Sequence, residues 1–250
     1  MNETPAPNYA QETPPQAVNI ALPSVLPRVT YAIIGVTIFV YLLQMASQFF
    51  FSGADYPAFM GMKINEAILA GQIWRLITPV LLHGSLLHIG FNMYALFAIG
   101  AGMESRMGHL RFLMLYLVSG FAGNVFSFYF TGANSLGAST AVFGLLAAEG
   151  VFLYLNKGLF GQRAQRALRN IVMVAGVNLF IGLSPGIDNW GHIGGLLGGL
   201  IFAWFGGPRW EVEGIYPLVQ VVDHRNLRDA ITGGLVVVGI FGVVAILKIF

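Results

Sequence analysis

Charge and cysteine are what this sequence of 250 residues lacks. Asp, Glu, Lys and Arg together make up 10% of it, against about 25% in an ordinary soluble domain. So few charges cannot cover a water-exposed surface, which excludes a soluble enzyme and a disordered chain. A net charge of +2 excludes a nucleic-acid partner. The absence of cysteine excludes disulfides, zinc–thiolate sites and thiol nucleophiles. We expect no metal and no cofactor.

Hydrophobic residues and glycine, in contrast, are abundant. Hydrophobic residues make up 56% of the chain, and 32 residues are glycine, near twice the usual share of about 7%. Small residues allow helices to pack closely within a membrane. The composition therefore predicts an all-α fold, a polytopic bundle of helices whose main solvent is the lipid bilayer.

The apolar residues are gathered into segments of membrane-spanning length. A helix needs about 20 apolar residues to cross a bilayer. The segments are 30–51, 79–103, 112–131, 136–155, 170–184, 190–206 and 231–250. The turn Ser184-Pro185-Gly186 separates two short segments. Two short helices there give seven spans, whereas one broken span gives six.

These segments divide the chain into four parts. Residues 1–29 are rich in proline and predict a disordered cytoplasmic tail, without the pattern of a signal peptide. Residues 30–207 hold the first six of these segments, and within them 52–78 is too apolar for a solvated loop and is expected to be a membrane-embedded outside loop. Residues 208–230 are a cytoplasmic connection, and 231–250 form a seventh transmembrane helix.

The basic residues indicate how the helices are oriented. A cytoplasmic N-terminus and seven spans place ten of the thirteen Lys and Arg residues on the inside. Cytoplasmic connections carry an excess of basic residues. This orientation is therefore predicted, with an integral membrane protein of a prokaryotic plasma membrane as the expected location.

Four polar residues inside the predicted spans suggest chemistry. His88 and Asn92 lie on one face of the second span, Ser139 begins the fourth, and His192 begins the sixth. All three spans start on the outside, so these groups can meet at one depth in the outer leaflet. A serine hydroxyl needs a base to take its proton, and His192 can be that base. Two further donors can stabilise an oxyanion.

Small and aromatic neighbours favour this contact. Gly195 and Gly199 belong to a stripe of glycines at four-residue spacing, which lets the sixth span approach the fourth. Phe143 follows Ser139 by four residues and can steady the imidazole of His192. Asp188 could orient His192, but capping of the sixth span, with Asn189 as the competitor, is the favoured role. A Ser–His dyad is therefore expected, and a triad is the alternative.

With these motifs the sequence resembles the rhomboid intramembrane serine proteases, from about Gly71 to Gly207. The shared features are Trp74-Arg75, His83, His88-x-x-x-Asn92, Gly100-x-x-x-Glu104-x-x-x-Gly108, Gly137-Ala138-Ser139 and Gly191-His192-x-x-Gly195-x-x-x-Gly199. Their order on alternate spans makes the resemblance specific. The family has a six-helix core, to which some members add a seventh helix.

The resemblance implies a role for each matching position. Ser139 would be the nucleophile and His192 the general base. His88, Asn92 and the backbone N–H of Ser139 would form the oxyanion hole. Further positions would shape or support the site: Gly137 and Phe143 beside the dyad, Trp74 and Arg75 in the outside loop, and Glu104 as a structural tie from the second span to its neighbours.

Two departures from the family pattern bear on activity. Thr140 stands where glycine usually follows the serine, and its branched side chain is expected to narrow the space beside the nucleophile. Phe143 lacks the hydroxyl of the more usual tyrosine. His83 is expected to be a surface histidine at the headgroups, and Glu149 a structural hydrogen-bonding group.

The leading hypothesis is an intramembrane serine endopeptidase whose partners are transmembrane protein substrates. The alternative is an inactive rhomboid-like protein that binds transmembrane helices, for which Thr140 is the sequence support. A small transporter is a third possibility, disfavoured because no repeat and no charged midplane site are found. The sequence leaves the oligomeric state open.

Overall fold

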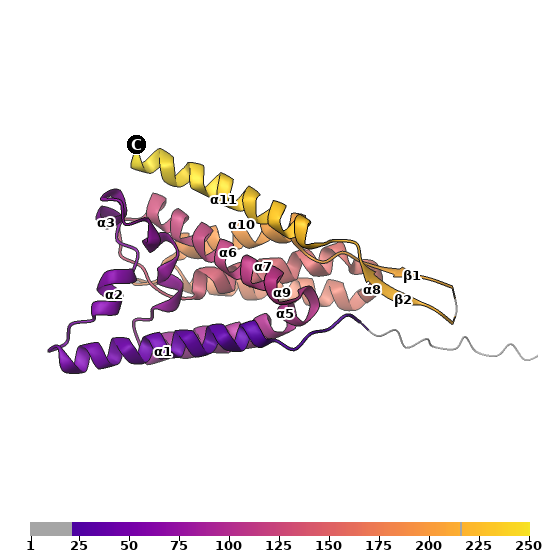
Figure 1. The fold of residues 1–250 in the computed structure, drawn as a ribbon, viewed down its shortest axis with the longest axis horizontal. Coiled ribbons are helices and arrows are strands. Elements are labelled where there is room, and N and C mark those ends of the chain that lie inside the picture. The colour runs from indigo at the N-terminus through magenta and orange to yellow at the C-terminus, as the bar shows by residue number, and fades with distance from the viewer. Residues whose placement is uncertain (1–21, 216) are drawn as a thin grey trace, which may run out of the picture.

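The computed structural model describes residues 22–215 and 217–250, and helices dominate it (Figure 1). The prediction for residues 1–29 falls mostly outside the described residues. Each predicted apolar segment corresponds to one long helical unit. These units are α1 (Arg28–Phe50), α4 (Leu86–Ala95) continued through the π-helical η3 (Leu96–Gly100) into α5 (Ala101–Met107), α6 (His109–Phe130), α7 (Ser139–Leu155), α9 (Gln162–Ile181), α10 (Asn189–Gly206) and α11 (Leu227–Ile249).

The predicted polytopic membrane bundle is confirmed. Among the described residues, four units are long and apolar enough to cross a membrane: α1, α4–α5, α6 and α11. Helix α7 is apolar but shorter, at 17 residues. The seventh helix begins at Leu227, earlier than predicted, because Asn226 and Asp229 form a capping box there.

The second and fifth helical units begin elsewhere than the sequence predicts. Residues 73–81 form two short 3₁₀ helices, η1 (Ile73–Leu76) and η2 (Thr78–Leu81), so the span does not begin at 79. The side chain of Ser85 caps α4 by accepting a hydrogen bond from the backbone N–H of His88 at 3.2 Å. Helix α9 begins at Gln162, eight residues before the predicted start at 170, because two charged turns precede its apolar part.

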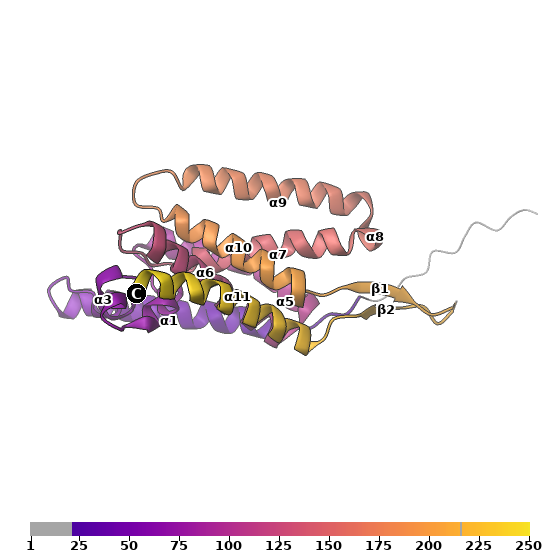
Figure 2. The ribbon, with the colours of Figure 1, turned by 90° about the horizontal axis from the view of Figure 1, so that it is seen from above.

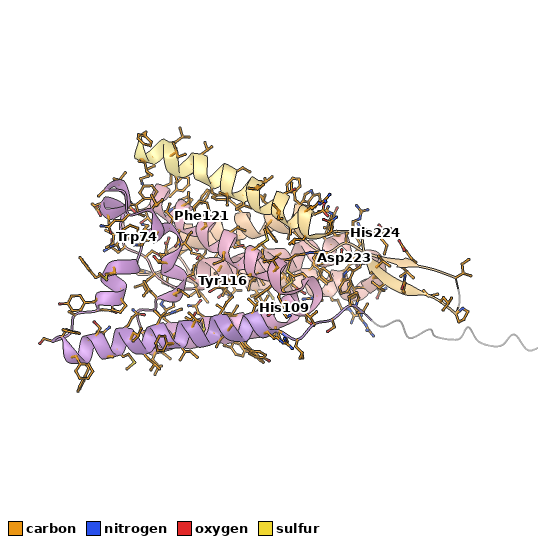
Figure 3. All side chains as sticks on the ribbon, viewed as in Figure 1. Trp74, His109, Tyr116, Phe121, Asp223 and His224 are labelled. Carbon is orange, nitrogen blue, oxygen red and sulfur yellow. The ribbon has the colours of Figure 1, made fainter. Side chains whose placement is uncertain are left out.

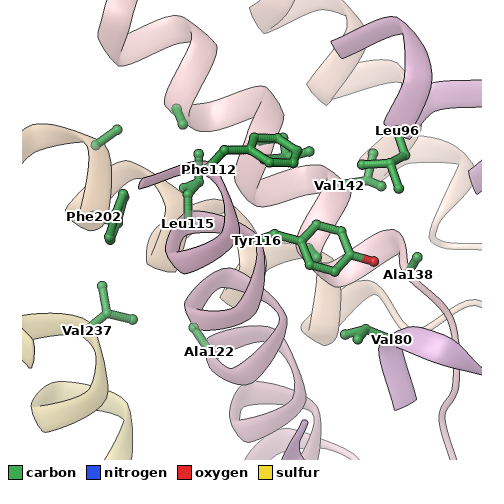
Figure 4. Packing of buried hydrophobic residues seen from close by; sticks show 14 of the residues in the cluster. Val80, Leu96, Phe112, Leu115, Tyr116, Ala122, Ala138, Val142, Phe202 and Val237 are labelled. Atoms are coloured by element: carbon green, nitrogen blue, oxygen red, sulfur yellow. The ribbon is translucent and has the colours of Figure 1, made fainter. Parts of the chain in front are cut away.

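Helices α6, α7 and α10 form the centre of the bundle. Figure 4 shows Tyr116 of α6 among Leu96, Val142 and Val80, all buried in one core cluster. Helix α10 reaches α7 through glycines: a Cβ atom on Gly195 would collide with the backbone of Thr140, and one on Gly199 with that of Gly144. The predicted small-residue contact therefore exists, and α9 lies at the edge of the bundle (Figure 2).

One end of the bundle, here called the loop end, carries α2 (Tyr56–Gly61) and α3 (Asn65–Leu69) (Figure 1). The indole of Trp74, labelled in Figure 3, donates to the backbone carbonyl of Met60 at 3.2 Å. The guanidinium of Arg75 donates to the carbonyl of Met62 at 2.8 Å. Trp74 and Arg75 thus tie the second half of the predicted membrane-embedded loop to its first half.

The opposite end, here called the hairpin end, carries the short α8 (Lys157–Phe160) and a two-stranded hairpin. Strands β1 (Trp210–Glu213) and β2 (Gln220–Asp223) pair antiparallel, with Trp210 opposite Asp223. The chain is otherwise helical, as predicted, and these two four-residue strands lie within the predicted connection 208–230. Arg111 of α6 holds its base through the carboxylate of Asp223 at 2.7 Å (Figure 3).

Glu104 also lies at the hairpin end and joins three helices. Its carboxylate is fully buried and accepts hydrogen bonds from the backbone N–H groups of Val29 (2.8 Å) and Thr30 (2.7 Å). It also bonds the hydroxyl of Thr30 and the imidazole of His109. Because the first N–H groups of a helix have no intrahelical partner, this carboxylate caps α1 from outside. Glu149, in turn, forms an ion pair with Arg106.

Candidate active site

Ser139 and His192 meet at the loop end of the bundle. Ser139 is the first residue of α7, and His192 lies in the first turn of α10. The close glycine contact between these two helices brings the side chains together. The Oγ of Ser139 lies 2.9 Å from the Nε2 of His192, which is hydrogen-bonding distance. Ser139 is partly exposed, so the pair is buried on one side and accessible on the other.

Phe143 fixes the imidazole plane. Its ring stacks on that of His192 with centroids 4.3 Å apart and planes inclined by 12°. Stacking of this kind contributes about 0.5–1.5 kcal/mol. It restrains rotation of His192 about its side-chain bonds while leaving both ring nitrogens free for hydrogen bonding.

No carboxylate completes a triad within the described residues. The Nδ1 atom of His192 is buried and has no hydrogen-bond partner there. Asp188, the nearest candidate along the chain, accepts a hydrogen bond from the backbone N–H of Gly191 at 2.9 Å and so caps α10. The predicted capping role of Asp188 is confirmed, whereas the expected Ser–His dyad stays a prediction.

His88 lies on the other side of the candidate nucleophile. A Cβ atom on Gly137 would lie 2.8 Å from Nε2 of His88 and 3.7 Å from Oγ of Ser139. Gly137 has φ of +135°, a conformation that side chains disfavour. Glycine is therefore required here for two reasons, backbone conformation and the approach of His88. The imidazole and the hydroxyl flank one small space.

Asn92 is placed one helical turn farther along α4 on the same face as His88. Its side chain is buried, and its amide donates to the backbone carbonyl of His88 at 3.0 Å. One amide hydrogen is thereby engaged within the helix, and no bond to Ser139 is formed. Ala138 caps α7 without a side-chain hydrogen bond, and the first backbone N–H groups of a helix, here beginning with Ser139, have no intrahelical partner.

The prediction for His83 as a surface residue is wrong. His83 is 1% exposed, and its Nε2 accepts a hydrogen bond from the backbone N–H of Ala138 at 3.4 Å. The side-chain amide of Gln44 in α1 accepts a hydrogen bond from the backbone N–H of His83 at 3.0 Å and donates one to the backbone carbonyl of His83 at 3.2 Å. His83 therefore supports the residue before Ser139. Gln44 supports the site through His83 and is absent from the predicted residues, although an amide within an apolar span is itself a signal.

Thr140 is accommodated by glycines of two neighbouring helices. Its side chain is 3% exposed. A Cβ atom on Gly191 would lie 3.1 Å, and one on Gly123 2.8 Å, from its methyl carbon. The branched side chain thus occupies space between α6 and α10 that these glycines leave open. The expected narrowing of the space beside Ser139 stays a prediction, and the hydrogen bond between Ser139 and His192 is formed in the presence of Thr140.

Comparisons with known proteins place the same region in one family. A family model described as "Rhomboid domain" matches residues 70–209, more than half of the chain. "Rhomboid protease GluP" of Bacillus subtilis is 37% identical over 178 residues, which cover 71% of this chain and 34% of that protein.

Plant proteins match as well. In Arabidopsis thaliana, "RHOMBOID-like protein 4" is 37% identical over 56% of this chain and 36% of its own length. "RHOMBOID-like protein 7" is 40% identical over 52% of this chain and 42% of its own length. The matches therefore span less than half the length of these three relatives. Since they come from a bacterium and a plant, the expected prokaryotic membrane stays a prediction.

Proposed function

Because the chain belongs to the rhomboid family, we propose that it is an intramembrane serine endopeptidase in which Ser139 and His192 form the catalytic dyad. The observation that carries this proposal is the 2.9 Å contact between Oγ of Ser139 and Nε2 of His192. Nucleophile and base within hydrogen-bond reach, with the base held by a third group, are the geometric mark of an activated serine. Here the third group is the ring of Phe143.

The proposed reaction is acyl transfer followed by hydrolysis. Oγ of Ser139 attacks the peptide carbonyl carbon while Nε2 of His192 takes the hydroxyl proton. The carbonyl oxygen becomes negative, and the donors around the space beside Gly137 stabilise it: the imidazole of His88, the backbone N–H of Ser139 and the amide hydrogen of Asn92 that His88 does not engage. His192 then gives its proton to the leaving amine, and water attacks the acyl-enzyme.

The proposed substrates are transmembrane segments of other proteins. The site lies at the end of α7 within an apolar bundle, so a substrate helix approaches from the lipid. Peptide hydrolysis needs an extended strand in the site, which favours segments with residues that weaken a helix. We further propose that the hairpin end, which carries the arginines at the starts of α1, α9 and α11, is cytoplasmic, and that the active site opens to the outside.

The decisive experiment uses the purified full chain in proteoliposomes with a single-span test substrate. Ser139→Ala and His192→Ala should each abolish cleavage, and Ser139→Ala should also abolish labelling by a fluorophosphonate. Ser184→Ala, at an exposed turn on the same end of the bundle, is the matched control and should cleave like the wild type. Cleavage that persists in Ser139→Ala would overturn the proposal.

The alternative, an inactive member of the family that binds transmembrane helices, rests on Thr140 in place of glycine. The same experiment separates the two. A folded wild-type chain that binds the test substrate but is neither labelled nor able to cleave supports the binding function. The accommodation of Thr140 between α6 and α10 favours the enzyme.

A further inference from the structure

The segment that leads into Ser139, residues 131–138 and here called the nucleophile loop, is held by the loop end at several points. The backbone N–H of Lys63 donates to the carbonyl of Ser135 at 2.9 Å, and the N–H of Ser135 donates back at 3.1 Å. The N–H of Gly137 donates to the carbonyl of Pro79 at 2.9 Å. The position of Ser139 therefore depends on residues more than fifty positions earlier in the chain.

The side chain of Lys63 makes a second connection to the same loop. It is fully buried, which is unusual for lysine unless its ammonium group is bonded. Its Nζ donates to the carbonyls of Thr131 at 3.1 Å and Ala133 at 2.6 Å. In residues 22–215 and 217–250, Lys63 forms no ion pair with a carboxylate. The buried charge is thus directed at the first turn of the nucleophile loop.

Lys248 of α11 makes similar bonds one turn earlier. Its Nζ donates to the carbonyls of Phe128 at 2.5 Å and Tyr129 at 2.8 Å. These carbonyls belong to the last turn of α6, where intrahelical donors run out and a positive charge is favourable. The two lysines therefore bind the carbonyls of successive segments of the chain. Lys248 caps the end of α6, and Lys63 holds the chain after α6 has ended.

We propose that Lys63 is a positioning residue for Ser139, acting through the nucleophile loop, whereas Lys248 only anchors α11 to α6. The inference rests on the proposed function in one respect, that Ser139 is the nucleophile. Methionine at position 63 keeps the length of the side chain but leaves the carbonyl of Ala133 without its donor and the carbonyl of Thr131 with the amide of Asn65 alone. The loop then loses a fixed path from α6 to α7, and the hydroxyl of Ser139 is no longer held against His192.

Lys63→Met and Lys248→Met form a matched pair, since each removes one lysine and two carbonyl contacts. In proteoliposomes, we expect Lys63→Met to lower kcat at least about tenfold with KM within about twofold, as misplacement of a reacting group does. We expect Lys248→Met to keep kcat within about twofold while lowering the melting temperature. Equal losses of kcat in the two variants, or unchanged kcat in folded Lys63→Met, would overturn the proposal.

Hydrogen exchange measured by mass spectrometry supplies a readout that does not depend on activity. Lys63→Met should accelerate exchange of the amides of Ser135 and Gly137, whereas Lys248→Met should affect the end of α6 alone. Unchanged exchange of the nucleophile loop in Lys63→Met would also overturn the proposal. If Lys63→Met does not fold, Lys63→Gln takes its place with the same expectations. A wild type that is neither labelled nor active refutes the protease function, while the exchange data still decide the role of Lys63.

Discussion

The contact between α7 and α10 offers a sharp test of how the dyad is assembled. Gly195 of α10 lies directly against the backbone of Thr140 in α7. A Cβ atom at this position would lie 2.8 Å from the carbonyl carbon of Thr140 and 3.2 Å from its Cα, and nearer still to its carbonyl oxygen. Carbon atoms in contact prefer about 3.5–4.0 Å. Since the obstacle is backbone, Gly195→Ala can be accommodated only if the two helices separate.

The required separation is about 1 Å at this level of the bundle, if the methyl group is to reach ordinary contact distance. Ser139 and His192 lie within one turn of the contact, so their 2.9 Å hydrogen bond lengthens to roughly 3.5–4 Å, beyond the useful range. A misplacement of this size costs about 100-fold in rate. Overpacking lowers the free energy of unfolding by about 1–3 kcal/mol.

The assay compares kcat for a test substrate in proteoliposomes with thermal unfolding in detergent. Gly242→Ala in α11 is the control, because nothing lies within 4 Å of a Cβ atom there. It should leave kcat unchanged and stabilise the helix by about 1 kcal/mol. A folded Gly195→Ala variant with kcat near the wild-type value would refute the reasoning that helix approach sets the dyad distance.

Three other predictions concern residues around the site and its supports. Glu104→Ala removes the acceptor that caps α1 and should lower the free energy of unfolding by about 2–4 kcal/mol; a thermal melt with less than about 0.5 kcal/mol of loss contradicts this. Phe143→Leu removes the stacking of the imidazole and should lower kcat by about 2- to 13-fold, whereas Phe143→Tyr should keep it within about twofold. Burial lowers the pKa of Lys63 from 10.5 to about 8, a shift that the charges of Asp188 and Glu66 partly oppose. The folded chain then binds fewer protons than the unfolded chain between pH 8 and pH 10.5. The free energy of unfolding of the wild type, relative to that of Lys63→Met, should accordingly rise with pH by at most about 1.4 kcal/mol per pH unit. A difference between the two proteins that stays constant across this pH range contradicts the lowered pKa of Lys63.

Much of the site could be inferred from one-dimensional patterns. The spacing of His88 and Asn92 puts both on one face of a helix, and the glycine stripe around Gly195 predicts a close partner. Both statements need only helix periodicity. His83 shows the opposite case. Nothing in its immediate neighbours distinguishes a headgroup histidine from one buried under Ala138, because its burial depends on Gln44 of α1 and on the loop before Ser139.

Local signals also failed where capping and charge competed with hydropathy. The apolar residues 79–82 place the start of the second span at 79, whereas the polar His83-Gly84-Ser85 makes that start loose. In the structure Ser85 supplies the helix cap, and 3₁₀ turns precede it. Helix α9 extends to Gln162 because its arginines are good helix formers, although they do not count as apolar. The hairpin over 210–223 has only four residues in each strand, too few for a clear alternating pattern.

The sequence by itself determined that lipid is the main solvent, where the apolar helices lie, and which polar side chains lie within them. Scarcity of charge and helical periodicity are properties of the linear sequence, so no tertiary contact is needed to detect them. Only the tertiary structure decided that Oγ of Ser139 and Nε2 of His192 lie 2.9 Å apart without a carboxylate on Nδ1 of His192. It alone also decided that the side chain of Thr140 lies between glycines of α6 and α10 and that Lys63 bonds the carbonyls of Thr131 and Ala133. These facts depend on distances between helices and loops that are remote in sequence. Such distances are set by the packing of backbone against glycine and by hydrogen bonds from side chains to backbone carbonyls.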